Sequence, residues 1–127
     1  MENVKIAVVD GDATVRAFVV NLLTYCVNRH VLSFEDAESA WDHFQGHADI
    51  DIFVLEVGNS GGLDVLERIK ERDAGRICVA MSSSSEDEQR AGKLGADAFL
   101  AKPFGMDDLF AVVQSFVAEE GKSTTAV

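Results

Sequence analysis

Five short apolar runs alternate along the chain with stretches whose apolar residues recur at helical spacing, and this alternation constrains the fold most strongly. The strand-like runs are residues 4–9, 30–34, 52–55, 77–81 and 98–101. The helical stretches are residues 15–23, 37–44, 63–71, 86–94 and 106–118. Strands that alternate with helices form parallel sheets with helices on both faces. We therefore expect an α/β fold, a doubly wound five-stranded parallel sheet with five helices.

The length of the chain, 127 residues with 47 % hydrophobic residues, suits one domain with one core. We expect this domain to span residues 1–118. Residues 119–127 lose the apolar periodicity, which is typical of a C-terminal tail or of the beginning of a linker. The sequence leaves these two alternatives open.

Charge and hydropathy exclude several classes of function. The 22 acidic and 11 basic residues give a net charge of −11, which repels nucleic-acid phosphates and anionic lipids. We therefore expect no direct binding to nucleic acid or membrane. No apolar run approaches the ~20 residues that span a bilayer, and the first residues lack the features of a signal peptide. The expected location is the cytoplasm.

The cysteines and histidines show no metal-ligand pattern. Cys26 and Cys78 stand alone in apolar surroundings, so we expect two small buried residues and no disulfide or zinc site. His30, His43 and His47 are expected to be solvated at the surface.

Polar residues follow the strand-like runs at their carboxyl ends, the edge where ligands bind in an open parallel sheet. Asp10, Gly11 and Asp12 follow the first run, Glu56 the third, Ser82 the fourth and Lys102 the fifth. Carboxylates can hold a hard cation, and a lysine with a hydroxyl can stabilise a phosphoryl group. The pattern therefore indicates a phosphoryl-transfer site with a place for Mg²⁺.

Four segments also carry a family resemblance: Val8-Val9-Asp10, Asp51-Ile52-Phe53-Val54-Leu55-Glu56, Val79-Ala80-Met81-Ser82, and the most specific, Gly95-Ala96-Asp97-Ala98-Phe99-Leu100-Ala101-Lys102-Pro103-Phe104. Together the chain resembles the receiver domain of two-component response regulators, such as the chemotaxis regulators, over nearly its whole length. The resemblance implies a flavodoxin-like sheet of strand order 2-1-3-4-5. It also implies phosphorelay signal transduction, in which a histidine kinase phosphorylates an aspartate after strand three, with Mg²⁺ bound by acids after strand one.

The resemblance assigns roles to residues of this chain. Glu56 stands at the phosphoacceptor position, Ser82 and Lys102 support the phosphoryl group, and Phe99 is the aromatic that switches together with Ser82. Pro103 would follow a cis peptide bond. For Phe99, ordinary half-buried packing is slightly favoured over the switch, because phenylalanine has no hydroxyl.

Three departures from the family pattern weaken the phosphorylation chemistry. Glu56 replaces the aspartate, and its added methylene displaces the carboxylate by ~1 Å, enough to lose on the order of a hundredfold in rate. Gly11 replaces a second acid, which leaves Asp10, Asp12 and the backbone of Gly58 as weak metal ligands. The loop after Glu56 is also shortened. We therefore expect weak or absent Mg²⁺ binding.

Two residues keep competing interpretations. Glu56 is either a permanent mimic of the phosphorylated state or a simple ion-pair partner of Lys102. Asp12 is favoured as the N-cap of the first helix over a metal ligand.

Ser85 with Glu88 three residues later predicts a capping box at the start of the fourth helix.

The sequence thus favours an atypical, or pseudo-receiver, domain that is not an enzyme and signals by binding a protein. The resemblance implies a kinase, effector or motility protein as partner, on the face of the fourth helix, fifth strand and fifth helix; a homodimer stays open. One alternative is a receiver phosphorylated on a neighbouring acid: Asp10, Asp12 or, less favoured because it opens the third strand, Asp51. The other is a small phosphatase resembling the haloacid dehalogenases, suggested by Asp10-Gly11-Asp12.

Overall fold

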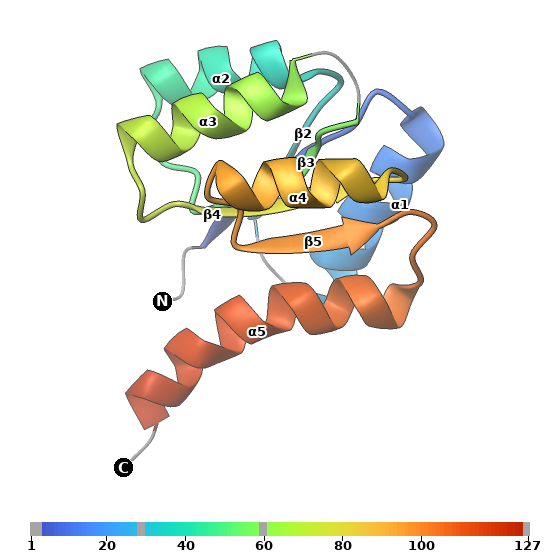
Figure 1. The fold of residues 1–127 in the computed structure, drawn as a ribbon. Coiled ribbons are helices and arrows are strands. Elements are labelled where there is room, and N and C mark those ends of the chain that lie inside the picture. Colours follow the sequence, from blue (N-terminus) through green and yellow to red (C-terminus); the bar gives the residue numbers. More distant parts are fainter. Residues whose placement is uncertain (1–3, 28–29, 59–60, 126–127) are drawn as a thin grey trace.

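The computed structural model of the chain describes residues 4–27, 30–58 and 61–125. Its strands form one parallel sheet in the order β2-β1-β3-β4-β5 (Figure 1). The strands are β1 (Lys5–Val9), β2 (His30–Phe34), β3 (Ile52–Glu56), β4 (Ile77–Ser82) and β5 (Ala98–Ala101). The expected sheet, its strand order and its five helices are therefore confirmed.

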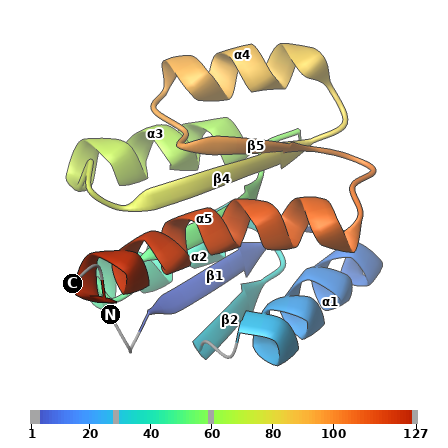
Figure 2. The ribbon, with the colours of Figure 1, turned by 90° about the horizontal axis from the view of Figure 1, so that it is seen from below.

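Helices cover both faces of the sheet (Figures 1 and 2). The helices are α1 (Ala13–Leu22), α2 (Ala37–Gly46), α3 (Gly62–Arg72), α4 (Ser85–Lys93) and α5 (Met106–Thr125), and α1 continues into a π-helical turn, η1 (Leu23–Val27). Apolar residues of α1 and α5 belong to one core cluster, and those of α2, α3 and α4 belong to the other. The sheet is thus a central layer between two helical layers.

The two core clusters follow from the alternation of side chains along each strand. In β1, Ile6 and Val8 face the α1 and α5 cluster, while Ala7 and Val9 face the other. The residues that face either side of β1 are therefore all apolar. In β3, all of the positions are buried. This is the pattern of a parallel strand covered on two faces.

The strands end level with one another, which positions the candidate site. Val9 pairs with Leu55, Glu56 pairs with Met81, and Ser82 pairs with Ala101. The residues that follow or end β1, β3, β4 and β5 therefore lie along one edge of the sheet.

Several local expectations are confirmed. Asp12 is the N-cap of α1, and its side chain accepts hydrogen bonds from the backbone N–H groups of Thr14 and Val15 at 2.9 and 3.2 Å. Cys78 is buried. The side chain of Cys26 and loop residues 59–60 lie outside the described part of the chain, so the expectations on them stay predictions.

Two helix ends differ from the sequence-based expectation. The capping box at Ser85 is wrong: Ser84 is the N-cap of α4, with no side-chain capping bond, and Ser85 is the first helical residue. At the other end of the chain, α5 continues beyond Ala118 to Thr125. Whether residues 119–127 serve as a tail or as a linker stays a prediction.

Candidate functional site

Lys102 joins two strand ends at the carboxyl edge of the sheet. Its ammonium group lies 2.7 Å from Oδ2 of Asp10 and also donates a hydrogen bond to Oε2 of Glu56. Asp10 is 1 % exposed and Glu56 is 8 % exposed. The sequence-predicted acids and lysine therefore meet, and they form a largely buried triad of two negative charges and one positive charge.

The remaining oxygens of both carboxylates are also bonded within the protein. Oδ1 of Asp10 accepts a hydrogen bond from the backbone N–H of Asp12 at 2.8 Å. Oε1 of Glu56 accepts one from the backbone N–H of Gly58. Each buried carboxylate is thus held by one backbone donor and by the same ammonium group, which offsets much of its desolvation cost.

The pKa of Lys102 is raised above its ordinary value. Partial burial disfavours its charge, but the hydrogen bonds and negative charges of Asp10 and Glu56 outweigh that effect. Lys102 is therefore charged throughout the physiological pH range.

Ser82 reaches the same edge, but its hydroxyl group is directed to a residue that the sequence did not single out. Its Oγ donates a hydrogen bond of 2.6 Å to Oδ2 of Asp87, and accepts one of 3.1 Å from the backbone N–H of Ser84. Asp87 lies in the first turn of α4 and is 8 % exposed. The sequence signal for it was an acid only five residues after Ser82, close enough to fold back in the first helical turn.

The arrangement does not fit a bound Mg²⁺, which needs several free oxygen ligands. All four carboxylate oxygens of Asp10 and Glu56 accept hydrogen bonds from protein donors, and Asp12 caps α1. Among residues 4–27, 30–58 and 61–125, no three His, Cys, Asp or Glu side chains are arranged to hold a metal ion.

Phe99 and Pro103 lie where the family resemblance places them. Phe99 is half-buried on β5 between two surface grooves, of about 220 Å³ beside α4 and about 430 Å³ beside α5. The peptide bond between Lys102 and Pro103 is cis, as expected. Whether Phe99 switches or only packs stays a prediction.

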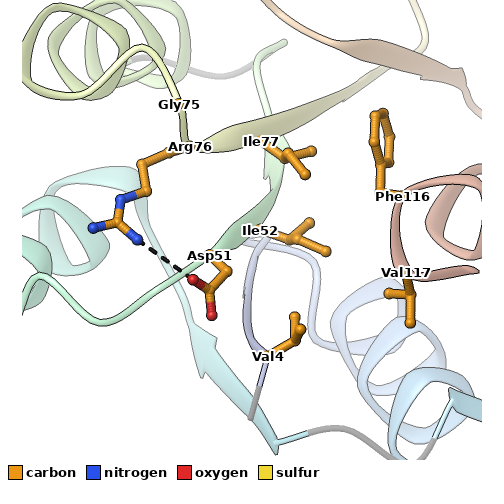
Figure 3. A pocket seen from close by; sticks show the side chains of 8 residues that line it. All are labelled: Val4, Asp51, Ile52, Gly75, Arg76, Ile77, Phe116 and Val117. Atoms are coloured by element: carbon orange, nitrogen blue, oxygen red, sulfur yellow. Dashed lines mark hydrogen bonds and ion pairs between the residues drawn. The ribbon is translucent and has the colours of Figure 1, made fainter. Parts of the chain in front are cut away.

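Asp51 lies at the opposite edge of the sheet, as the sequence indicates. Its carboxylate pairs with Arg76 at 3.4 Å, beside a cavity of about 120 Å³ (Figure 3). The other lining residues are Val4, Ile52, Gly75, Ile77, Phe116 and Val117. This mostly apolar cavity is separate from the candidate site.

The histidine expectation is only partly right. His30 and His47 are exposed, but His43 is half-buried, stacks on His47 and lies 3.7 Å from a carboxylate oxygen of Asp49. Packing against β2 explains this burial, because the ring of His43 lies 5.6 Å from that of Phe34, and His43 follows the buried Ala40 by three residues on the same side of α2.

Comparison with known proteins gives the family. Residues 6–114 match the family described as the response regulator receiver domain. The response regulator Rre1 of Synechocystis is 27 % identical over 98 % of this chain, and a chemotaxis protein CheY homologue of Campylobacter jejuni is 26 % identical over 79 % of it. The chain covers 56 % of the first relative and 82 % of the second, so it spans about half of the Rre1 length.

Solved structures agree with this assignment. The BeF3-activated DrrB receiver domain is 27 % identical, with a TM-score of 0.78 over 91 % of this chain and 98 % of its own. A CheY-like receiver domain protein from Methanospirillum hungatei, 18 % identical, shares the fold with a TM-score of 0.84 over 95 % of this chain and 98 % of its own. The chain therefore belongs to the response regulator receiver domain family of two-component signalling.

Proposed function

We propose that this receiver signals by binding a protein partner and is not phosphorylated on Glu56. The observation that carries the proposal is the ion pair between Glu56 and Lys102, completed by Asp10. An incoming phosphoryl group would have to displace Lys102 from two buried carboxylates, and Glu56 already carries the added methylene. The triad instead holds the edge of the sheet in one arrangement without a phosphoryl group.

The neighbouring acids are poor substitutes as phosphoacceptors. Asp10 is bonded to Lys102 and to the backbone of Asp12, Asp12 caps α1, and Asp51 pairs with Arg76 at the far edge. We therefore favour a receiver that works without phosphorylation. Weak or absent Mg²⁺ binding is part of this proposal, because Mg²⁺ would compete with the same hydrogen bonds.

The same contacts disfavour the phosphatase alternative. A haloacid-dehalogenase-like reaction would need Asp10 as a nucleophile and Asp12 as a general acid. Asp10 is 1 % exposed and paired, and the Asp12 side chain accepts two backbone hydrogen bonds. No catalytic role is proposed for this chain.

The proposed partner surface is the face of α4, β5 and α5. β5 is the edge strand next to β4, and Phe99 with its two grooves lies on this face. Met106 and Phe110 of α5 are 57 % and 36 % exposed, which adds apolar surface that a partner can bury. A kinase, an effector or a motility protein remains the proposed class of partner.

Within the described ranges, no helix is long and apolar enough to cross a membrane.

Intact-mass measurement after incubation with acetyl phosphate and Mg²⁺ tests the proposal. The expected result is no gain of a phosphoryl group by the wild-type chain. Gain of one group that is lost in Glu56→Gln would refute it. A group that remains in Glu56→Gln and maps to Asp10 or Asp12 would support the alternative with a neighbouring acceptor.

A further inference from the structure

Asp87 is a buried acid with no role in the receiver chemistry described so far. It lies on α4, while the other buried polar side chains of the described residues, Asp10, Glu56 and Ser82, come from the strand ends. An acid in the first turn of a helix needs no burial to benefit from the helix dipole. Its burial against Ser82 therefore requires a separate explanation.

The hydrogen bond from Ser82 to Asp87 consumes the only hydroxyl hydrogen of the serine. A serine hydroxyl donates one hydrogen bond, and at 2.6 Å that bond goes to Oδ2 of Asp87. A bond from a hydroxyl to a carboxylate is charge-assisted and about twice as strong as a neutral one. While it persists, Ser82 has no hydrogen to offer to a phosphoryl oxygen.

Asp87 also borders the space in front of Gly58, beside the carboxylate at the phosphoacceptor position. A Cβ atom placed on Gly58 would lie 2.7 Å from Oε1 of Glu56, 2.9 Å from Oγ of Ser82 and 3.5 Å from Oδ2 of Asp87. Two carboxylate oxygens and the serine oxygen thus surround one point. A phosphoryl group near that point would meet both negative charges. The cation that pairs with Asp87 is Arg90, which lies 4.0 Å from its other oxygen on a side chain that is 62 % exposed.

We propose that Asp87 is a positioning residue that takes the place of the phosphoryl oxygen as the acceptor for Ser82. It keeps Ser82 turned toward α4 and ties the first turn of α4 to the end of β4. The inference rests on the proposed function, because it concerns a receiver that is set without phosphorylation. It adds a second, independent obstacle to phosphorylation beside the Glu56 substitution.

Hydrogen exchange without Mg²⁺ or a phosphodonor tests whether the hydrogen bond between Ser82 and Asp87 stabilises the first turn of α4. In Asp87→Ala, the hydrogen-bonded backbone amides of Ser84 and Asp87 should exchange at least about tenfold faster than in the wild type, because a charge-assisted bond is lost. Asp87→Asn, which keeps a side-chain acceptor, should recover part of this protection. Glu86→Ala is the matched control, since it removes an exposed acid from the same turn and should leave the exchange unchanged. Equal exchange in Asp87→Ala and Glu86→Ala would overturn the inference.

Phosphorylation of variants in which aspartate replaces Glu56 tests whether Asp87 hinders phosphoryl transfer. Acetyl phosphate with Mg²⁺ is added to Glu56→Asp and to Glu56→Asp/Asp87→Ala. The bond from phosphorus to the acetate oxygen breaks, acetate leaves with the electron pair, and a bond forms from phosphorus to the introduced carboxylate. The double variant should be phosphorylated at least about tenfold faster, since Ser82 is released and one negative charge is gone. Glu56→Asp/Glu86→Ala should behave like Glu56→Asp alone.

The outcomes separate this inference from the proposed function. Equal phosphorylation of the single and double variants, whether fast or absent, overturns the role of Asp87. So does a phosphoryl group that maps to Asp87 itself. None of these results concerns the wild-type chain, whose phosphorylation on Glu56 would overturn the proposed function instead.

Discussion

The ammonium group of Lys102 lies 2.7 Å from Oδ2 of Asp10 while it also hydrogen-bonds Glu56, so one cation neutralises carboxylates from two strands. The three residues come from the ends of β1, β3 and β5. The candidate site is therefore closed by its own ion pairs, and the fold at this edge depends on them.

Replacing Lys102 by methionine should destabilise the protein strongly. Lys102→Met keeps the aliphatic stem but leaves Asp10 and Glu56 buried without their cation, which costs about 3 kcal/mol or more in the free energy of unfolding. Urea unfolding at neutral pH measures the change. Lys93→Met, on the exposed last turn of α4, is the control and should cost less than about 1 kcal/mol. Equal effects of the two substitutions would contradict the buried triad.

The stabilisation by Lys102 should also depend on pH. Its pKa is raised in the folded state, so its contribution is fully present below the unfolded lysine value of 10.5. That contribution is lost as the pH rises through the raised pKa. The difference in unfolding free energy between wild type and Lys102→Met should therefore shrink above pH 10.5. A difference that stays constant up to complete alkaline unfolding would argue against the assignment.

Gly58 should not tolerate a side chain. In Gly58→Ala, the new Cβ would lie 2.7 Å from Oε1 of Glu56 and 2.9 Å from Oγ of Ser82. The Glu56 carboxylate is held through its other oxygen by Lys102, and Oγ of Ser82 is held by Asp87, so neither side chain is free to move away. We expect a loss of about 1–3 kcal/mol in unfolding free energy. Gly92→Ala is the control, because nothing lies within 4 Å of its Cβ and alanine favours the α4 helix by about 1 kcal/mol. Thermal unfolding of both variants decides the matter, and a neutral Gly58→Ala would disprove the close approach.

Asp12 should behave as a helix cap and not as a metal ligand. Asp12→Ala should lower the unfolding free energy by about 1 kcal/mol, and Asp12→Ser should recover most of it. Glu35→Ala serves as the control, since its carboxylate is exposed and lies 3.9 Å from Arg16. Both effects should be the same with and without Mg²⁺. Stabilisation of the wild type by Mg²⁺ that disappears in Asp12→Ala would show that a metal ligand had been removed.

Cys78 should be nearly unreactive in the folded protein, because burial raises the pKa of its thiol to about 12. In a Cys26→Ser background, iodoacetamide at pH 8 should label native protein at least about a hundredfold more slowly than urea-unfolded protein. The folded pKa lies above the unfolded value of 9.0, so this stabilisation is complete below pH 9.0 and is lost toward pH 12. Rapid labelling of the native chain would contradict the burial of Cys78.

The sequence predicted the fold and most of the edge because both depend on local patterns. Apolar runs mark the strands, and the residues that follow each run must lie at the carboxyl edge. The sequence pattern alone therefore predicts that Asp10, Glu56, Ser82 and Lys102 meet there. The partner of Ser82 could not be predicted in the same way. Asp87 is reached only through the turn into α4, where an acid is ordinarily explained by the helix dipole. The nearby Ser85 and Glu88 suggested a capping box that α4 does not use.

The sequence also could not predict whether the carboxylates of Asp10 and Glu56 are available to a ligand or bonded within the protein. Whether Glu56 reaches Lys102 depends on side-chain geometry across two strands, which no spacing in the sequence encodes. The same holds for Asp10, whose position suggested a metal ligand although its oxygens bond to Lys102 and to the backbone of Asp12.

Titration with beryllium fluoride and Mg²⁺, a non-covalent mimic of a phosphoryl group, tests the central claim most directly. Two-dimensional amide NMR spectra of the wild-type chain would follow the backbone signals of Glu56, Ser82 and Lys102. The closed triad predicts no saturable shift of these signals. Saturable shifts at all three residues, spreading to α4 and β5, would show that the site opens for a phosphoryl group and would contradict the account.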